Sequence, residues 1–156
     1  MRDLADIVTS TANPPVPQAI TASAYSASSK DKGVAALDYA SGEIIYGVCA
    51  VTTLFAGASN AGVNVYWTDD TPSAGAFGSN TPVDLQLLGL LPAAAAPGAA
   101  TSFIQTPLAP NLTTQQLMGF HFVPVTANLS AGAVVAGFTT DPDTWKAYAA
   151  SYTVNG

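Results

Sequence analysis

Charged residues are scarce in this chain of 156 residues. Only 9% of them are Asp, Glu, Lys or Arg, whereas about 25% is usual for a globular domain. Four residues are basic, and the formal net charge is −6. A surface that binds nucleic acid or an anionic membrane needs clustered Lys or Arg side chains. We therefore expect neither nucleic acid nor a membrane among the partners of this protein.

Cysteine and histidine occur once each, as Cys49 and His121. A single cysteine cannot form an intramolecular disulfide, and zinc sites need several Cys or His ligands. Cys49 lies among apolar residues without a nearby positive charge, which favours a small buried hydrophobe over a reactive thiolate. We therefore expect no metal and no other cofactor.

Long hydrophobic runs are also missing from the sequence. No segment approaches the ~20 apolar residues of a membrane-spanning helix. The N-terminal residues 1–8 include Asp3 and Asp6 where a signal peptide would have an apolar run. We expect a protein that is made in a cytoplasm and stays in solution.

Short β-type segments fill most of the chain, and hydrophobic residues make up 49% of it. The segments are rich in β-branched and aromatic residues and are separated by Gly- and Pro-containing turns. The longest, residues 43–55, is predicted to be a central strand with Ile45 and Val51 buried. The remaining predicted strands are residues 19–26, 63–68, 83–91, 101–106, 118–125 and 133–139. This pattern predicts one all-β domain, a sandwich or a barrel.

The N-terminal residues 1–18 differ from this pattern and are interpreted as an arm. Leu4, Ile7 and Val8 have helical spacing, but such a helix would be too short to be stable alone. Pro14, Pro15 and Pro17 then keep the chain extended.

The C-terminal residues 141–156 form a second candidate arm. Trp145, Tyr148 and Tyr152 follow one another at spacings of three and four, and large aromatic residues are common interface anchors. We predict that residues 1–18, this tail, or both hold another molecule. The alternative is that both ends fold back and cover an edge strand of their own domain.

Candidate catalytic residues are few. His121 lies between Phe120 and Phe122, so on a strand it points away from both, toward solvent or a partner. No nucleophile motif accompanies it, and a structural role is the simpler interpretation. Two acidic pairs, Asp69–Asp70 and Asp141 with Asp143, are interpreted as a turn and a strand end. The polar residues 28–33 are predicted to form another turn, and Val83, Leu85 and Leu87 are predicted to share one face of a strand.

Two segments near the ends of the predicted β domain have a distinctive sequence. The first is Pro-Gln-Ala-Ile-Thr-Ala-Ser-Ala-Tyr-Ser at residues 17–26, followed by Asp31 and Gly33. The second is Phe-His-Phe-Val-Pro-Val at residues 120–125, with Leu-Ser-Ala-Gly at 129–132 and Val-Val-Ala-Gly-Phe at 134–138. Together they resemble the small capsid cement (decoration) proteins of tailed bacteriophages. Lys30 and the long tail depart from the family pattern.

The resemblance implies a β-sandwich of the jelly-roll type, which we place at residues 19–140, between the arms that the composition predicts at residues 1–18 and 141–156. It also implies a protein without enzymatic activity that binds the outer capsid surface and bridges major capsid proteins of the same virion. We expect a homo-oligomer whose interface includes Leu4, Ile7, Val8, Trp145, Tyr148 and Tyr152.

Two other functions are considered beside this one. A tail or fibre module could bind a host glycan through Tyr66, Trp67 and the Asp69–Asp70 turn, since jelly rolls also serve as lectins. A hydrolase on a β-sandwich is the third possibility. The copy number in purified particles would separate the three.

Overall fold

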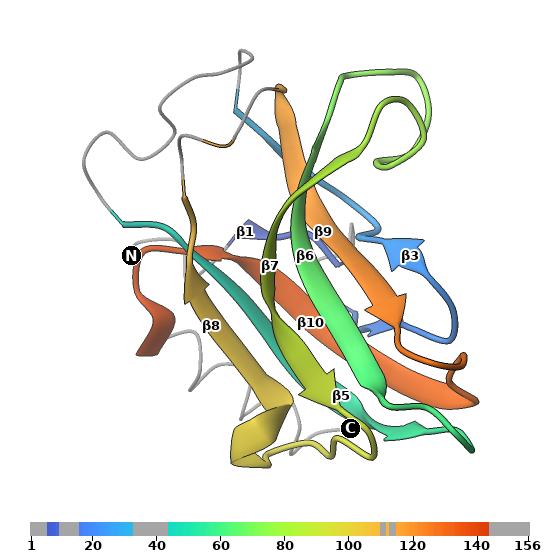
Figure 1. Ribbon diagram of the computed structural model, residues 1–156. Helices are drawn as coiled ribbons and strands as arrows, with labels where there is room; N and C mark the ends of the chain where they lie inside the picture. Colours follow the sequence, from blue (N-terminus) through green and yellow to red (C-terminus); the bar gives the residue numbers. More distant parts are fainter. Residues whose placement is uncertain (1–5, 10–15, 33–43, 110–111, 113–114, 144–156) are drawn as a thin grey trace.

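The computed structural model describes residues 6–9, 16–32, 44–109, 112 and 115–143. These residues form two antiparallel sheets that pack face to face (Figure 1). A short 3-10 turn, η1, spans Ala100–Ser102. Among the described residues, no helix has the length and apolar character needed to cross a membrane. The predicted all-β sandwich is therefore confirmed.

The first sheet has the strand order β1-β10-β5-β8, and β2 also pairs with β10. Its central strand β5 has neighbours on both sides, as predicted for the longest β-type segment. The strands of this sheet are β1 (Asp6–Ile7), β2 (Gln18–Ala19), β5 (Tyr46–Ala56), β8 (Phe103–Pro107) and β10 (Ala131–Thr139).

The second sheet has the order β3-β9-β6-β7, and β4 also pairs with β9. A turn is predicted at residues 28–33, but Lys30 and Asp31 form β4 instead, because they pair along the outer edge of β9. The strands of this sheet are β3 (Ala24–Tyr25), β4 (Lys30–Asp31), β6 (Gly62–Asp70), β7 (Val83–Pro92) and β9 (Leu117–Pro124).

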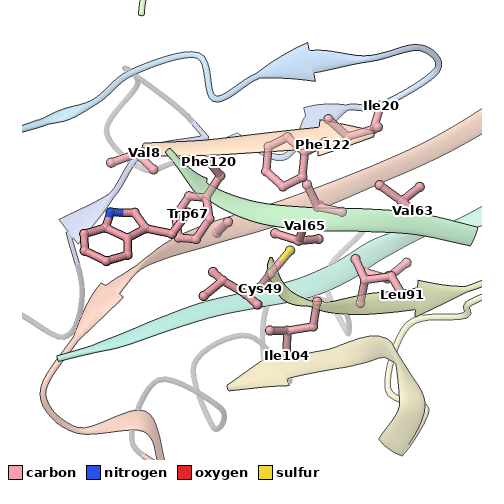
Figure 2. Close-up of a cluster of buried hydrophobic side chains, with 14 of the residues drawn as sticks. Val8, Ile20, Cys49, Val63, Val65, Trp67, Leu91, Ile104, Phe120 and Phe122 are labelled. Atoms are coloured by element: carbon pink, nitrogen blue, oxygen red, sulfur yellow. The ribbon is translucent and has the colours of Figure 1, made fainter. Parts of the chain in front are cut away.

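The hydrophobic core lies between the two sheets (Figure 2). Ile45 is 9% exposed and Val51 is 1% exposed, as predicted. Both sheets contribute large buried side chains to this core, among them Phe55, Val63, Trp67, Leu91, Met118, Phe120 and Phe122. Such a shared core means that neither sheet buries its apolar face without the other.

The pattern of burial along β7 differs from the predicted alternation. The pairing of β7 with β6 shifts register twice, at Leu85 and at Leu88. Each β-bulge adds one residue to β7 and reverses the face of the residues that follow. Leu88 and Leu91 therefore lie in the core, whereas Val83 and Leu87 are exposed and do not share a buried face with Leu85.

Short N-terminal strands complete the outer edges of both sheets. Strands β1 and β2 pair with β10, and β3 and β4 pair with β9. Where these strands stop, a hydroxyl replaces the backbone acceptor: Thr9 Oγ1 lies 3.1 Å from Ala136 N, and Ser26 Oγ lies 3.1 Å from Phe120 N. The backbone donors of the central strands thus stay satisfied along both edges.

The predicted helical turn at Leu4–Val8 is wrong for Asp6–Ile7, which form β1. Val8 continues this edge, donates from its backbone to Ala136 and is 2% exposed in the core. Edge pairing satisfies backbone groups that a helix of two turns would leave open. The sandwich therefore begins before residue 19, and the described residues 6–9 belong to it rather than to a separate arm.

Candidate functional site

The outer face of the second sheet carries His121. Alternation along β9 directs Phe120 and Phe122 into the core, where each is 0% exposed. His121 points to the opposite face, as the sequence predicted, and its side chain is 15% exposed. His121 therefore lies on a strand with neighbours on both sides, and residues on the outer face of the sheet can contact it.

Two tyrosines flank His121 in the neighbouring strands. Tyr25 of β3 and Tyr66 of β6 both lie opposite His121 in the ladder. The Tyr25 ring stacks on the imidazole with centroids 4.2 Å apart and an interplanar angle of 18°, and the Tyr66 centroid is 6.3 Å from it. These contacts restrain the plane of the imidazole.

The loop at residues 71–82 supports Tyr25 from the other side. Phe77 meets the Tyr25 ring edge-on at 6.1 Å. A Cβ atom at Gly119 would lie 2.6 Å from the Phe77 ring, so glycine is needed there for this close approach. Asp70 fixes the loop by accepting backbone hydrogen bonds from Thr71, Gly78 and Thr81.

Asp69 and Asp70 do not form the predicted turn. Both lie at the end of β6 and are buried, at 0% and 1% exposed. Asp69 Oδ2 accepts a hydrogen bond of 2.9 Å from the backbone of Gln115, while Asp70 holds the 71–82 loop. The burial of Asp70 is tolerated because three backbone N–H groups bind its carboxylate in place of water.

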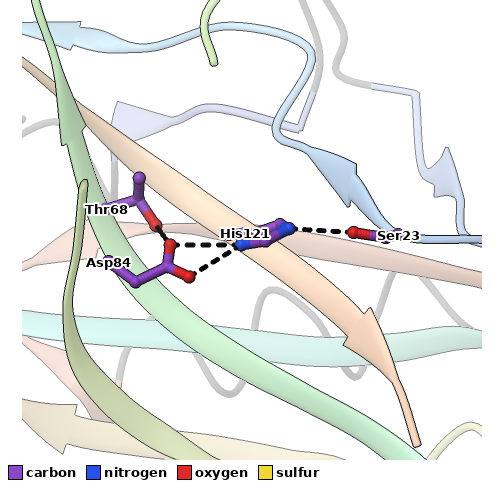
Figure 3. Close-up of polar contacts among 4 residues, drawn as sticks. All are labelled: Ser23, Thr68, Asp84 and His121. Atoms are coloured by element: carbon purple, nitrogen blue, oxygen red, sulfur yellow. Dashed lines mark hydrogen bonds and ion pairs between the residues drawn. The ribbon is translucent and has the colours of Figure 1, made fainter. Parts of the chain in front are cut away.

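Three polar side chains connect to His121 in a line (Figure 3). Asp84 of β7 lies 2.9 Å from His121 Nδ1 through Oδ2 and 3.1 Å through Oδ1. Thr68 Oγ1 donates to Asp84 Oδ1 at 2.6 Å. On the far side of the ring, Ser23 Oγ lies 2.9 Å from Nε2.

The fold brings these four residues together from different elements. Asp84 pairs with Thr68 across β6 and β7 because the bulge at Leu85 sets the register there. Ser23 lies in the exposed bend between β2 and β3, where the chain passes from the first sheet to the second. Ser23 and His121 are 98 residues apart in the sequence.

The order hydroxyl, imidazole, carboxylate is that of a nucleophile, a general base and an orienting acid. An ionised carboxylate only accepts hydrogen bonds. Nδ1–H of His121 therefore donates the hydrogen bond that Asp84 accepts. In the neutral imidazole, Nε2 then accepts from the Ser23 hydroxyl. Burial, followed by the negative charges of Asp84 and Asp70, raises the pKa of the nearby Tyr25 phenol.

This cluster was not predicted from the sequence. His121 was interpreted as structural, and no role was predicted for Ser23 or Asp84. One signal was present: Asp84 stands between Val83 and Leu85 in a predicted strand, which indicates a carboxylate on an outward face. Nothing in the sequence indicates that this face is the one that carries His121.

The residues predicted to form an interface are only partly placed. Val8 lies in the core and Ile7 in β1, whereas Leu4, Trp145, Tyr148 and Tyr152 lie outside the described residues. Of the residues considered for a sugar site, Trp67 lies in the core at 2% exposed, and Asp69 and Asp70 are buried. Tyr66 lies on the outer face, opposite His121 in the ladder.

Cys49 is fully buried in β5, as predicted, and burial raises the pKa of its thiol. Among the described residues, no group of three or more His, Cys, Asp or Glu side chains is arranged to hold a metal ion. Comparison of the sequence with family models and with curated proteins found no match.

Proposed function

We propose that this protein is a capsid cement protein, a structural virion component that binds the outer surface of a phage head and bridges its major capsid proteins. One observation carries the proposal. The two segments that resemble the cement family, far apart in the sequence, are hydrogen-bonded neighbours in both sheets. β2 pairs with β10 through Gln18 and Val134, and β3 pairs with β9 through Tyr25 and His121.

This pairing matters because two unrelated matches in Ala- and Val-rich sequence would have no reason to adjoin. The opening and closing segments instead form one structural unit in each sheet. The resemblance is therefore consistent with a shared arrangement of strands.

The strand order supports the jelly-roll part of the proposal. The two-residue strands β1 and β2 both pair with β10, and β3 and β4 both pair with β9. With one strand counted at each of these edges, the sheets have four positions each, in the orders β2-β10-β5-β8 and β3-β9-β6-β7. Consecutive strands β2 and β3 lie in different sheets, as do β9 and β10. Two four-stranded sheets joined in this way are typical of jelly rolls, which recur in viral capsid domains.

The surface composition supports binding through contact area rather than charge. Large apolar side chains are exposed along β7, where Val83 is 44%, Leu87 52% and Leu90 50% exposed. Apolar groups of this size are common in the centre of protein interfaces. On a shell, many modest contacts to a repeating lattice add up to firm attachment.

The major capsid protein of the same virion is the proposed partner, and a homo-oligomer on the shell is the proposed assembly. Trp145, Tyr148 and Tyr152 remain candidate anchors on the basis of their sequence spacing.

A reconstitution experiment tests this function. Purified protein is mixed with heads that lack it, and bound protein is counted after sedimentation. Saturable binding at a fixed number of copies per major capsid protein, with heads that resist heat better, is expected. Binding to tails or to host glycans, without binding to heads, would contradict the proposal and favour a tail or fibre module.

A further inference from the structure

We propose that Ser23 is a base-activated serine that transfers acyl groups from small neutral esters to water, an activity independent of shell binding. The proposal rests on the line of hydrogen bonds from Ser23 through His121 to Asp84. Ser23 Oγ is 2.9 Å from Nε2, and Asp84 Oδ2 is 2.9 Å from Nδ1. Both distances lie within the range required of a nucleophile and its general base.

The base is held rigidly in this geometry. His121 lies on β9, between β3 and β6, and its ring stacks on Tyr25 at 4.2 Å. Asp84 is itself oriented by Thr68, which is 0% exposed and donates to it. The imidazole therefore cannot turn away from Ser23 without losing both the stacking contact and the carboxylate.

The position of Ser23 is not explained by a structural role. The His121–Asp84 pair is complete without it, and the exposed hydroxyl could bond to water instead. Exposure also means that a substrate can reach the oxygen atom. An exposed hydroxyl bonded to a partly buried, oriented imidazole supplies the nucleophile and the general base of acyl transfer.

The surroundings of the serine indicate the class of substrate. The site lies on the outer face of the second sheet, where the Tyr25 ring stacks on His121 and the Tyr66 ring centroid is 6.3 Å from the imidazole. These groups favour a small aryl or alkyl ester. The carboxylate of Asp84 and the net charge of −6 disfavour an anionic substrate.

The reaction proceeds in two balanced steps. The Ser23 oxygen forms a bond to the acyl carbon, its proton passes to His121 Nε2, and the ester C–O bond breaks as that proton goes to the leaving alcohol. Water then attacks the acyl-serine with His121 as base. The acid leaves and Ser23 regains its proton. Asp84 and Thr68 position the imidazole and do not touch the substrate.

Labelling with a fluorophosphonate tests the nucleophile directly. The parent protein is incubated with the reagent, and the modified serines are located by peptide mass spectrometry. Ser130, exposed in the turn before β10, is the reference site within the same molecule. We expect Ser23 to react roughly 100-fold faster than Ser130, which is the lower part of the range for general-base assistance.

Three variants and one control variant separate activation from simple exposure. Ser23→Ala should abolish the adduct and the release of p-nitrophenol from p-nitrophenyl acetate that passes through an acetyl-serine, while Ser130→Ala should leave both unchanged. Asp84→Asn should slow labelling of Ser23 at least about tenfold, because the wrong tautomer then faces the serine. His121→Gln should slow it at least as much. Melting curves verify that each variant is folded.

The rate difference between the two serines is the readout that a merely structural role of His121 and Asp84 would not produce. Equal labelling of Ser23 and Ser130, or an unchanged rate in a folded Asp84→Asn variant, would overturn the proposal.

Discussion

Tyr25 joins several features of the second sheet at the scale of a single residue. Its ring stacks on His121 and meets Phe77 edge-on. The pKa of its phenol is raised, first by burial and then by Asp84 and Asp70. A raised pKa in the folded state means that folding favours the protonated phenol.

This shift predicts a loss of stability in alkali. Below pH 10.0, the ordinary pKa of tyrosine, the phenol is protonated in both states and the difference does not matter. Above it, the unfolded chain loses the proton first, so the free energy of unfolding decreases as the pH rises. Urea unfolding between pH 9 and pH 11 should show a shallower decrease for Tyr25→Phe than for the parent. Equal slopes in the two proteins would contradict this interpretation.

Val51 tests the position of the core at the same scale. It is 1% exposed in the central strand β5, whereas Thr53 of the same strand is exposed. Val51→Asp should prevent folding because an unpaired charge would lie between the sheets. Thr53→Asp should change the free energy of unfolding by no more than about 0.5 kcal/mol. A folded, cooperatively melting Val51→Asp protein would show that β5 does not contribute to the core in this way.

At the scale of the element, hydroxyl groups complete the hydrogen bonding at the edges of the two sheets. Ser26 and Thr9 accept hydrogen bonds from the backbones of β9 and β10, where the short outer strands stop. Ser26→Ala should leave the buried Phe120 N–H unsatisfied and lower the free energy of unfolding by about 1–3 kcal/mol. Chemical denaturation measures the effect, with Ser130→Ala as the control that should change little. If both variants unfold alike, the hydroxyl is not needed at this edge.

The stability of variants at Val8 and Val16 tests whether the N-terminal residues belong to the sandwich or to an arm. Val8 is 2% exposed and Val16 is 59% exposed. Val8→Ala should lower the free energy of unfolding by roughly 1–3 kcal/mol, while Val16→Ala should have little effect on it. Shell binding by the folded fraction should stay the same in Val8→Ala. Unchanged stability with weaker binding would instead restore residue 8 to an interface.

The sequence predicts a strand when the pattern that forms it is local in the chain. β5, β6, β9 and β10 could be predicted because their apolar and β-branched residues follow one another locally. The bulges of β7 could not, because Leu85 and Leu88 are extra residues only in relation to β6. β1 and β4, with two residues each, carry no periodic pattern and form only because β10 and β9 offer open edges.

At the scale of the whole molecule, the sequence predicted the all-β class, the central strand and the burial of Cys49. It did not predict the cluster at His121, since Ser23 and Asp84 come from two other parts of the chain and meet the histidine only after both sheets have formed. Composition predicted a protein that acts through its surfaces, and the resemblance predicts a cement protein; both stay predictions.

Localisation of the protein in images of purified virions tests the central proposal most directly. We predict two-layered density of the size of this domain on the outside of the head, repeated over the lattice and touching more than one major capsid protein. Density of this shape confined to the tail or its fibres, with a bare outer shell, would contradict the proposal.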